Sequence, residues 1–149
     1  MADKILNYEK QIKITAETAE LLHGKSYTWF APSVYWKDVN GDYELASYYD
    51  PVHDHIVCKY KAPTQTVLQK WLREIYSIYL YVEYSYIDSS TWEFTYEIIH
   101  FPEELRNKKR NNWERVSSFQ SAGGSYVGGF KTYEEALEKG LQESLKLIT

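Results

Sequence analysis

Residues 80–99 read LYVEYSYIDSSTWEFTYEII, and this stretch decides the fold. From Leu80 to Tyr86, and again from Trp92 to Ile99, apolar or aromatic residues alternate with polar ones, which is the period of a half-buried β-strand. The residues between these segments, Asp88-Ser89-Ser90, favour a turn. The stretch therefore predicts an antiparallel hairpin that carries much of the aromatic content of the chain.

A second group of strands is predicted upstream. Tyr27 to Val39 and Tyr43 to Tyr49 alternate on either side of Asn40-Gly41, which is a strong short-range hairpin signal. Asp50-Pro51 then breaks the pattern and begins a turn. From His53 to Lys61 the alternation resumes, so the three segments predict an antiparallel meander.

Two helices are predicted beside this meander. The first runs from Thr15 to His23, because Thr15 can cap it and Gly24 suits a left-handed stop. The second starts at Ala62-Pro63-Thr64, since proline fits the first turn of a helix. Its apolar stripe consists of residues at helical spacing, namely Val67, Leu68, Trp71, Leu72 and Ile75.

A third helix closes the chain. Thr132 followed three places later by Glu135 matches a capping box. Glu135 and Lys139 are spaced for an i,i+4 ion pair. The apolar and small residues at helical spacing are Ala136, Leu137, Gly140, Leu141, Ser144, Leu145 and Ile148.

The order of these elements predicts an α+β domain. We expect one antiparallel sheet of about five to six strands, in two hairpin groups, packed against two main helices and a short N-terminal helix. Trp113 to Phe119 is a possible further strand, between a charged loop at Pro102 to Asn112 and a glycine-rich connection at Gly123 to Gly129. A length of 149 residues suits a single domain, residues 1–149, with one hydrophobic core.

Composition narrows the class of protein. A net charge of −4 and a pI near 5.6 argue against a dedicated nucleic-acid coat, and we expect no sequence-specific nucleic-acid binding. Cys58 is the only cysteine, so neither an intramolecular disulfide nor a cysteine zinc site can form, and we expect its small side chain to be buried. Met1 to Asn7 does not match a signal peptide, and no apolar run is long enough to cross a membrane. We therefore expect a soluble, cytoplasmic protein.

Residues 62–74 read APTQTVLQKWLRE, and residues 132–143 read TYEEALEKGLQE. Both segments resemble small hypothetical proteins that phages and mobile elements of gut anaerobic bacteria encode. Glu17 to Leu21, followed by a tyrosine-rich hairpin that ends at Ser47-Tyr48-Tyr49, is similar to the start of the same proteins. Tyr79 to Gly129 has no counterpart in them.

The resemblance implies a context and no mechanism. The family has no assigned activity, so it supplies no functional residues for this chain. It implies an accessory protein of a phage or an integrated element. By analogy of class, some accessory proteins of this kind bind host defence enzymes, and others sequester the nucleotide messengers that those enzymes make.

Signals for catalysis or metal binding are weak. His53 and His55 could supply two metal ligands from one strand face, but this spacing alone is more typical of a solvated strand end. Glu83 and Glu93 lie on the two arms of the second hairpin and could face each other as a glycosidase pair does, although acidic residues on an outer sheet face are commoner. Gly124 to Thr132 lacks an intact Gly-Lys-Thr, yet its amides could cradle a phosphate at the helix start. We expect no catalytic residue, no bound metal and no cofactor.

The aromatic residues offer a binding surface. Four of them are expected in the core, namely Trp29, Trp71, Tyr79 and Tyr81. We expect a row of rings on one face of the second hairpin, formed by Tyr84 and Tyr86 on the first strand and by Trp92, Phe94 and Tyr96 on the second. Such a row can stack on a planar ligand or form a protein interface.

One basic stretch follows this hairpin, and its members are Arg106, Lys108, Lys109, Arg110 and Arg115. These side chains can neutralise phosphates, and Trp113 beside them can stack on a base. Together with the rings, they predict a non-enzymatic accessory protein that sequesters a small anionic, nucleotide-derived host ligand and counteracts host defence signalling. The predicted ligand-binding residues are Tyr84, Tyr86, Trp92, Arg106, Lys108, Lys109, Arg110 and Trp113.

The alternative function is a protein-binding inhibitor or interaction module. In that hypothesis the tyrosine-rich sheet face docks on a host protein. Either function predicts a homo-oligomer, because large exposed apolar patches rarely stay uncovered. Neither function predicts a membrane partner.

Overall fold

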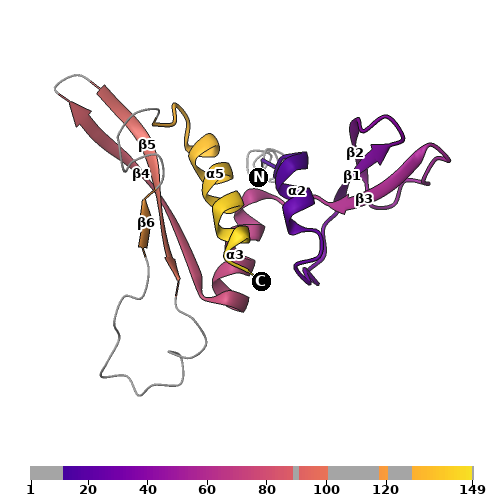
Figure 1. Cartoon of the computed structure of the whole chain (residues 1–149), viewed down its shortest axis with the longest axis horizontal. Helices are drawn as coiled ribbons and strands as arrows, with labels where there is room; N and C mark the ends of the chain where they lie inside the picture. The colour runs from indigo at the N-terminus through magenta and orange to yellow at the C-terminus, as the bar shows by residue number, and fades with distance from the viewer. Residues whose placement is uncertain (1–11, 89–90, 101–117, 121–128, 149) are drawn as a thin grey trace, which may run out of the picture. The chain divides into compact units, whose positions relative to one another are not determined.

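The computed structural model describes residues 12–88, 91–100, 118–120 and 129–148 (Figure 1). The chain forms two compact units, Met1–Leu68 and Gln69–Thr149. The boundary between them falls inside helix α3 (Gln65–Tyr76).

The first unit combines one short helix with a small sheet. Its elements are α2 (Ala16–Leu22), β1 (Ser33–Asp38), β2 (Tyr43–Ser47) and β3 (Ile56–Lys61). The strands are antiparallel in the order β2-β1-β3, which confirms the predicted meander. Helix α2 starts as predicted, because the Thr15 hydroxyl accepts from the Thr18 amide at 3.3 Å. Gly24 and Gly41 adopt positive φ angles of 85° and 88° at the predicted stop and turn.

All three strands of this unit are shorter than predicted. β1 begins only at Ser33, since the carbonyls of Tyr27 and Trp29 accept hydrogen bonds from the Lys61 ammonium and not from a neighbouring strand. β2 ends at Ser47 because a turn closes there, with the Asp50 amide donating to the Ser47 carbonyl at 3.1 Å. β3 starts at Ile56, whose amide donates to the His53 carbonyl at 3.1 Å and closes another turn.

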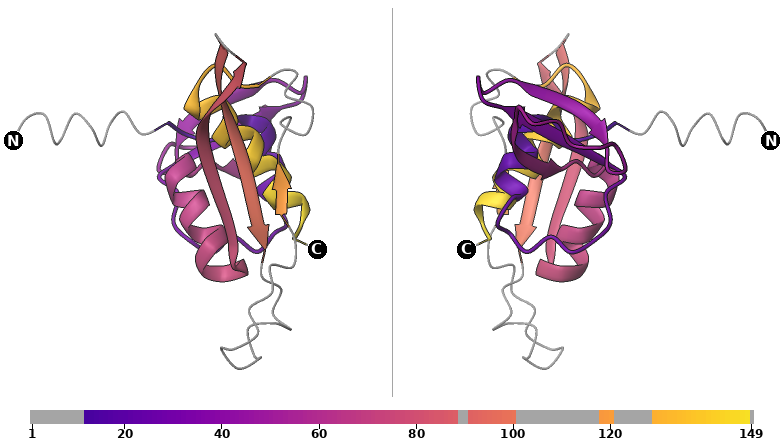
Figure 2. Two further views of the ribbon diagram at one scale, coloured as in Figure 1. Left: turned by 90° about the vertical axis from the view of Figure 1, so that its left-hand side faces the viewer. Right: turned by 90° about the vertical axis from the view of Figure 1, so that its right-hand side faces the viewer.

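The second unit places one long helix on a sheet. Its strands β4 (Ile78–Asp88), β5 (Thr91–His100) and β6 (Ser118–Gln120) are antiparallel in the order β4-β5-β6. Helix α5 (Tyr133–Lys146) lies against one face of this sheet (Figure 2). The Thr132 hydroxyl accepts from the Glu135 amide at 3.1 Å, so the predicted N-cap is confirmed. The whole predicted stripe of α5 is buried.

Details of the helices differ from the predictions. Helix α3 begins at Gln65 and not at Pro63, because Thr64 caps it and accepts from the Val67 amide at 3.3 Å. The end of its stripe, Ile75, is 46% exposed. In α5 the partner of Lys139 is Glu143, at 3.1 Å, and not Glu135.

The α+β class is confirmed, but the strands do not form one sheet. They divide into two three-stranded sheets, one in each unit. Each hairpin group pairs with itself, and α3 lies between the two groups along the chain. β6 coincides with the end of the strand predicted from Trp113 to Phe119. The rest of that strand, the loop at Pro102 to Asn112 and most of Gly123 to Gly129 lie outside the described residues.

Candidate functional site

The predicted rings of the second hairpin lie together. Tyr84 is paired with Phe94 across the strands, and Tyr86 with Trp92. The ring centroids of Tyr84 and Trp92 are 5.3 Å apart with an interplanar angle of 25°, so these rings stack. Tyr84 and Phe94 are 4.8 Å apart, and Tyr86 and Trp92 are 5.0 Å apart. We call these four residues, Tyr84, Tyr86, Trp92 and Phe94, the aromatic row.

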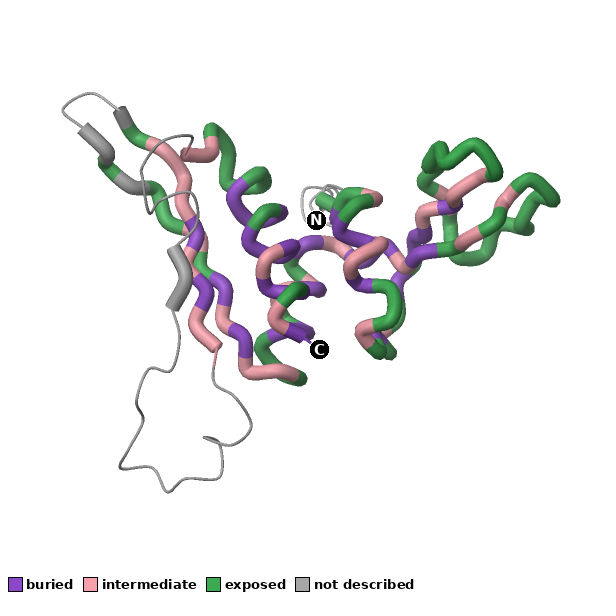
Figure 3. Tube along the Cα trace, in the orientation of Figure 1, coloured by how far each residue is buried: buried purple, intermediate pink, exposed green. Residues whose placement is uncertain are grey.

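The aromatic row continues the buried face of the sheet. Nearer the base of the hairpin, Leu80 and Tyr96 on the same face are 4% and 6% exposed and contact α5 at Gly140. The tip of the hairpin extends beyond the first turn of α5 (Figure 1), and burial falls from base to tip (Figure 3). In the row, Tyr84 is 59% exposed, and Tyr86 and Trp92 are each 52% exposed. An apolar face thus continues past the helix that covers it.

Two predictions about single rings are wrong. Tyr96 does not belong to the exposed row, because α5 covers it. Tyr81 is 48% exposed and not a core residue, since it projects from the face opposite to α5. Of the other residues expected in the core, Trp71 is buried, whereas Trp29 and Tyr79 are half-buried.

The structure describes only part of the predicted site. Tyr84, Tyr86 and Trp92 are neighbours in the aromatic row. The predicted cations and their neighbouring tryptophan lie outside the described residues, namely Arg106, Lys108, Lys109, Arg110, Trp113 and Arg115. Sequence reasoning missed Tyr133, the first residue of α5, whose ring meets Phe94 edge to face at 6.3 Å. Its position directly after the capping Thr132 was the available signal.

The hairpin that carries the row is acidic. Between Ile78 and His100 the sequence has four acidic residues and no lysine or arginine. Glu83 is paired with Thr95, and Glu93 with Ser85, so the two carboxylates share a face but are not directly opposite each other. Glu83 is exposed, whereas Glu93 is half-buried and lies against Gly129. The arrangement places acidic residues on the face of the hairpin opposite to its rings.

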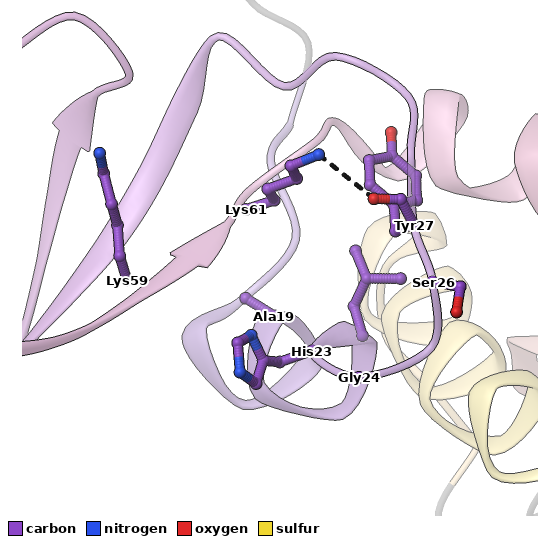
Figure 4. Close-up of a pocket in the computed structure, with 8 residues that line it drawn as sticks. Ala19, His23, Gly24, Ser26, Tyr27, Lys59 and Lys61 are labelled. Carbon is purple, nitrogen blue, oxygen red and sulfur yellow. Dashed lines mark hydrogen bonds between the residues drawn. The ribbon is translucent and has the colours of Figure 1, made fainter.

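A groove lies in the first unit, with a volume of about 420 Å³. Its wall includes Lys61, whose ammonium donates to the Tyr27 carbonyl at 3.2 Å (Figure 4). The same ammonium donates to the Trp29 carbonyl at 3.4 Å. This ammonium also lies 5.6 Å from the centre of the Tyr27 ring, and burial raises the pKa of Tyr27 to about 12. Because two loop carbonyls already hold the Lys61 ammonium, we assign it the role of fixing the segment before β1.

A polar cluster joins α2 to its sheet. Glu20 accepts a hydrogen bond from the Lys37 ammonium at 2.7 Å. The hydrogen bonds from Lys37 and then from Tyr43 lower the pKa of Glu20. The hydrogen bond that Lys37 donates to Glu20 is also the main reason that the pKa of Lys37 is raised. Cys58, expected to be buried, is half-buried, and hydrogen bonding between Cys58 and the Tyr60 hydroxyl raises the pKa of Tyr60.

We expect this cluster to make stability depend on acidic pH. The unfolded chain holds Glu20 near its usual pKa of 4.5, whereas the folded chain holds it lower. The contribution of Glu20 is therefore present above that usual pKa and is lost as the pH falls through the folded value. Between about pH 7 and about pH 3, chemical denaturation should show a larger loss of stability for the native chain than for Glu20→Gln. Parallel losses in both proteins would contradict this assignment.

Among the described residues, no third metal-ligating side chain joins His53 and His55. His53 and His55 stack at 5.7 Å, and His53 also packs edge to face on Trp36 at 5.8 Å. Among the described residues, no group of three or more histidine, cysteine, aspartate or glutamate side chains is placed to hold a metal ion. Of the phosphate cradle predicted at Gly124 to Thr132, residues 124–128 lie outside the described part of the chain.

Comparison with known proteins adds no assignment. No protein-family model, no curated protein and no solved structure matches the chain. Of the helices in the described ranges, none is long and apolar enough to span a membrane.

Proposed function

We propose that the chain is a non-enzymatic protein-interaction module and that the aromatic row is the surface that meets its partner. The observation that carries this proposal is the exposure of Tyr84, Tyr86 and Trp92, which are all more than half exposed on a sheet face that is buried at the base of the hairpin. Tyrosine and tryptophan are enriched in protein interfaces, and truncating them there is often costly. The rings also contact one another, so little side-chain entropy remains to be lost on binding.

The size of the surface agrees with a partner that binds reversibly. An aromatic side chain offers roughly 150–250 Å² of contact area, so three half-exposed rings present roughly 300 Å². This is the size of the patches that are often functional on a single protein, and it is below the roughly 800 Å² per partner of a standard stable interface. The row alone is therefore too small for an obligate dimer, and the expected homo-oligomer stays a prediction.

The charge of the hairpin favours a protein over a small anion. Residues 78–100 contain no lysine or arginine, so the rings stand in a negative local field. A nucleotide-derived ligand needs cations, and these would have to come from Arg106, Lys108, Lys109 and Arg110. Binding of a small nucleotide-derived ligand is therefore the alternative that the experiment below must distinguish. A phage or mobile-element context points to bacterial host proteins as the first partners to examine.

Photo-cross-linking can identify the partner. A benzophenone amino acid placed at Tyr86 should capture one host protein, and the same probe at Tyr49, in the turn after β2 of the first unit, should not. The purified partner is then titrated against Tyr84→Ala/Trp92→Ala. We expect the affinity to fall by about 30-fold or more, because truncating aromatic hot-spot residues typically costs about 2 kcal/mol or more.

Tyr49→Ala is the matched control, since Tyr49 is 78% exposed in the turn after β2, outside the hairpin, and should be neutral for binding. Equal losses in both variants, or no loss in either, would overturn the proposal. A thermal shift with a nucleotide or cyclic dinucleotide that disappears when Arg106, Lys108, Lys109 and Arg110 are neutralised would assign the rings to a small anionic ligand instead.

A further inference from the structure

Among the described residues, no strand pairs with the outer edge of β4 beside the aromatic row. β4 is the outermost strand, because the order is β4-β5-β6. At the base of the hairpin the Gln69 side chain donates to the Leu80 carbonyl at 2.8 Å and so covers the edge there. Past this point, and among the described residues, no hydrogen bond reaches the outer edge of β4.

The direction of the backbone groups on β4 follows from the neighbouring strand. The amide and carbonyl of Phe94 bond to Phe130, on the side of β5 away from β4, at 2.8 and 3.0 Å. Phe94 and Tyr84 are therefore a non-hydrogen-bonded pair, and the backbone groups of Tyr84 point outward. Because this direction alternates along a strand, Val82 and Tyr86 also present their amide and carbonyl groups to the open edge.

The residues with outward backbone groups are also those that carry the apolar face. Val82, Tyr84 and Tyr86 project their side chains toward the side on which α5 lies. A strand that paired with this edge would place every second side chain next to the rings. Its other side chains would lie on the face of Tyr81 and Glu83, both of which are exposed.

Charge determines which strand fits. The hairpin carries Glu83, Asp88, Glu93 and Glu97 and no lysine or arginine. A second copy of this chain, paired by the same edge, would bring two hairpins of the same negative sign together. A strand with lysine or arginine on the Glu83 face would instead complement the carboxylates.

We propose that residues 82–86 of β4 accept an extended segment of the partner protein as an added antiparallel strand, with apolar residues on the aromatic row alternating with basic residues on the Glu83 face. This inference rests on the proposed function, because it specifies how the partner meets the rings. Backbone hydrogen bonds provide affinity in such strand addition, and the alternating side chains provide specificity.

The test uses labelled synthetic peptides and the full chain. The parent probe is an acetylated and amidated peptide of four Val-Lys repeats, and its binding is followed by fluorescence anisotropy. In an antiparallel pair the valines lie opposite Val82, Tyr84 and Tyr86, and their amides point toward β4. N-methylation of the valines should weaken binding by about 100-fold, because each bond lost also leaves a backbone group unpaired. N-methylation of the lysines is the matched control and should leave affinity unchanged.

Two results would overturn the inference. One is that the two N-methylated peptides bind with equal affinity, that the lysine-methylated peptide binds more weakly than the valine-methylated one, or that neither peptide binds. Each of these outcomes would exclude antiparallel strand addition. The other is equal affinity for a peptide of four Val-Glu repeats, which would exclude the charge requirement. If the cross-linked partner still depends on Tyr84 and Trp92, the proposed function stands in both cases: the first result removes strand addition, and the second removes the requirement for basic residues.

Discussion

Trp71→Ala is expected to lower the free energy of unfolding by about 3–5 kcal/mol, the usual cost of truncating a buried aromatic side chain. Trp71 is the largest fully buried side chain among the described residues, at 1% exposure, and its ring meets Tyr76 edge to face at 5.0 Å. Its removal leaves a cavity that the surrounding side chains can fill only partly. Denaturant titration should show a lower midpoint with an unchanged slope.

Trp92→Ala is the matched control for this prediction. The same change is made on the aromatic row, where Trp92 is 52% exposed and no cavity can form. We expect it to cost much less stability than Trp71→Ala while it weakens partner binding. If the two substitutions cost the same stability, Trp92 has a role in the core that its exposure does not indicate.

Gly140→Leu is expected to destabilise the second unit by about 1–3 kcal/mol or more through overpacking. A Cβ atom at this position would lie 2.5 Å from Leu80 Cδ1 and 3.2 Å from Tyr96 Cγ. Leu80 and Tyr96 are themselves buried, so α5 has to move away from the hairpin to accommodate a leucine. That movement would also displace Tyr133 from Phe94 at the start of the helix.

Lys139→Leu introduces the same side chain at the exposed neighbouring position of α5. Lys139 contacts Glu143 in a surface ion pair, and such pairs contribute little to stability. Its loss should therefore change the free energy of unfolding by less than about 1 kcal/mol. Thermal or denaturant unfolding of both variants measures the difference. Equal stability of the two would mean that the contact of α5 with the sheet is looser than the Gly140 geometry implies.

Local sequence signals predicted the helices and strands. Contacts between distant segments determine how the strands are divided between the two sheets, and local signals could not predict this division. The cap at Thr132 and the helical spacing behind it are local, and the structure confirms both. The division into two sheets depends on which hairpin group pairs with which, and no residue spacing specifies that choice.

In the candidate site, the burial of each ring likewise could not be predicted from local sequence signals. Phe94 and Tyr96 lie on one face of β5 and have the same aromatic character, yet Tyr96 is buried under α5 and Phe94 is half-buried beside the first residue of this helix. Sequence alone predicts that the two share a face, but where the helix begins determines how far each ring is buried. Tyr133 joins Phe94 for the same reason, since the position of α5 brings them together.

The stacked rings of the hairpin have an optical consequence. Trp92 lies in a polar environment, whereas Trp36 and Trp71 are 3% and 1% exposed, so its emission is expected at longer wavelength than theirs. Tyr84 and Tyr86, at 5.3 and 5.0 Å, are close enough to transfer their excitation energy to its indole. A partner that covers this part of the chain should therefore shift the intrinsic fluorescence of the protein toward the blue, without any label.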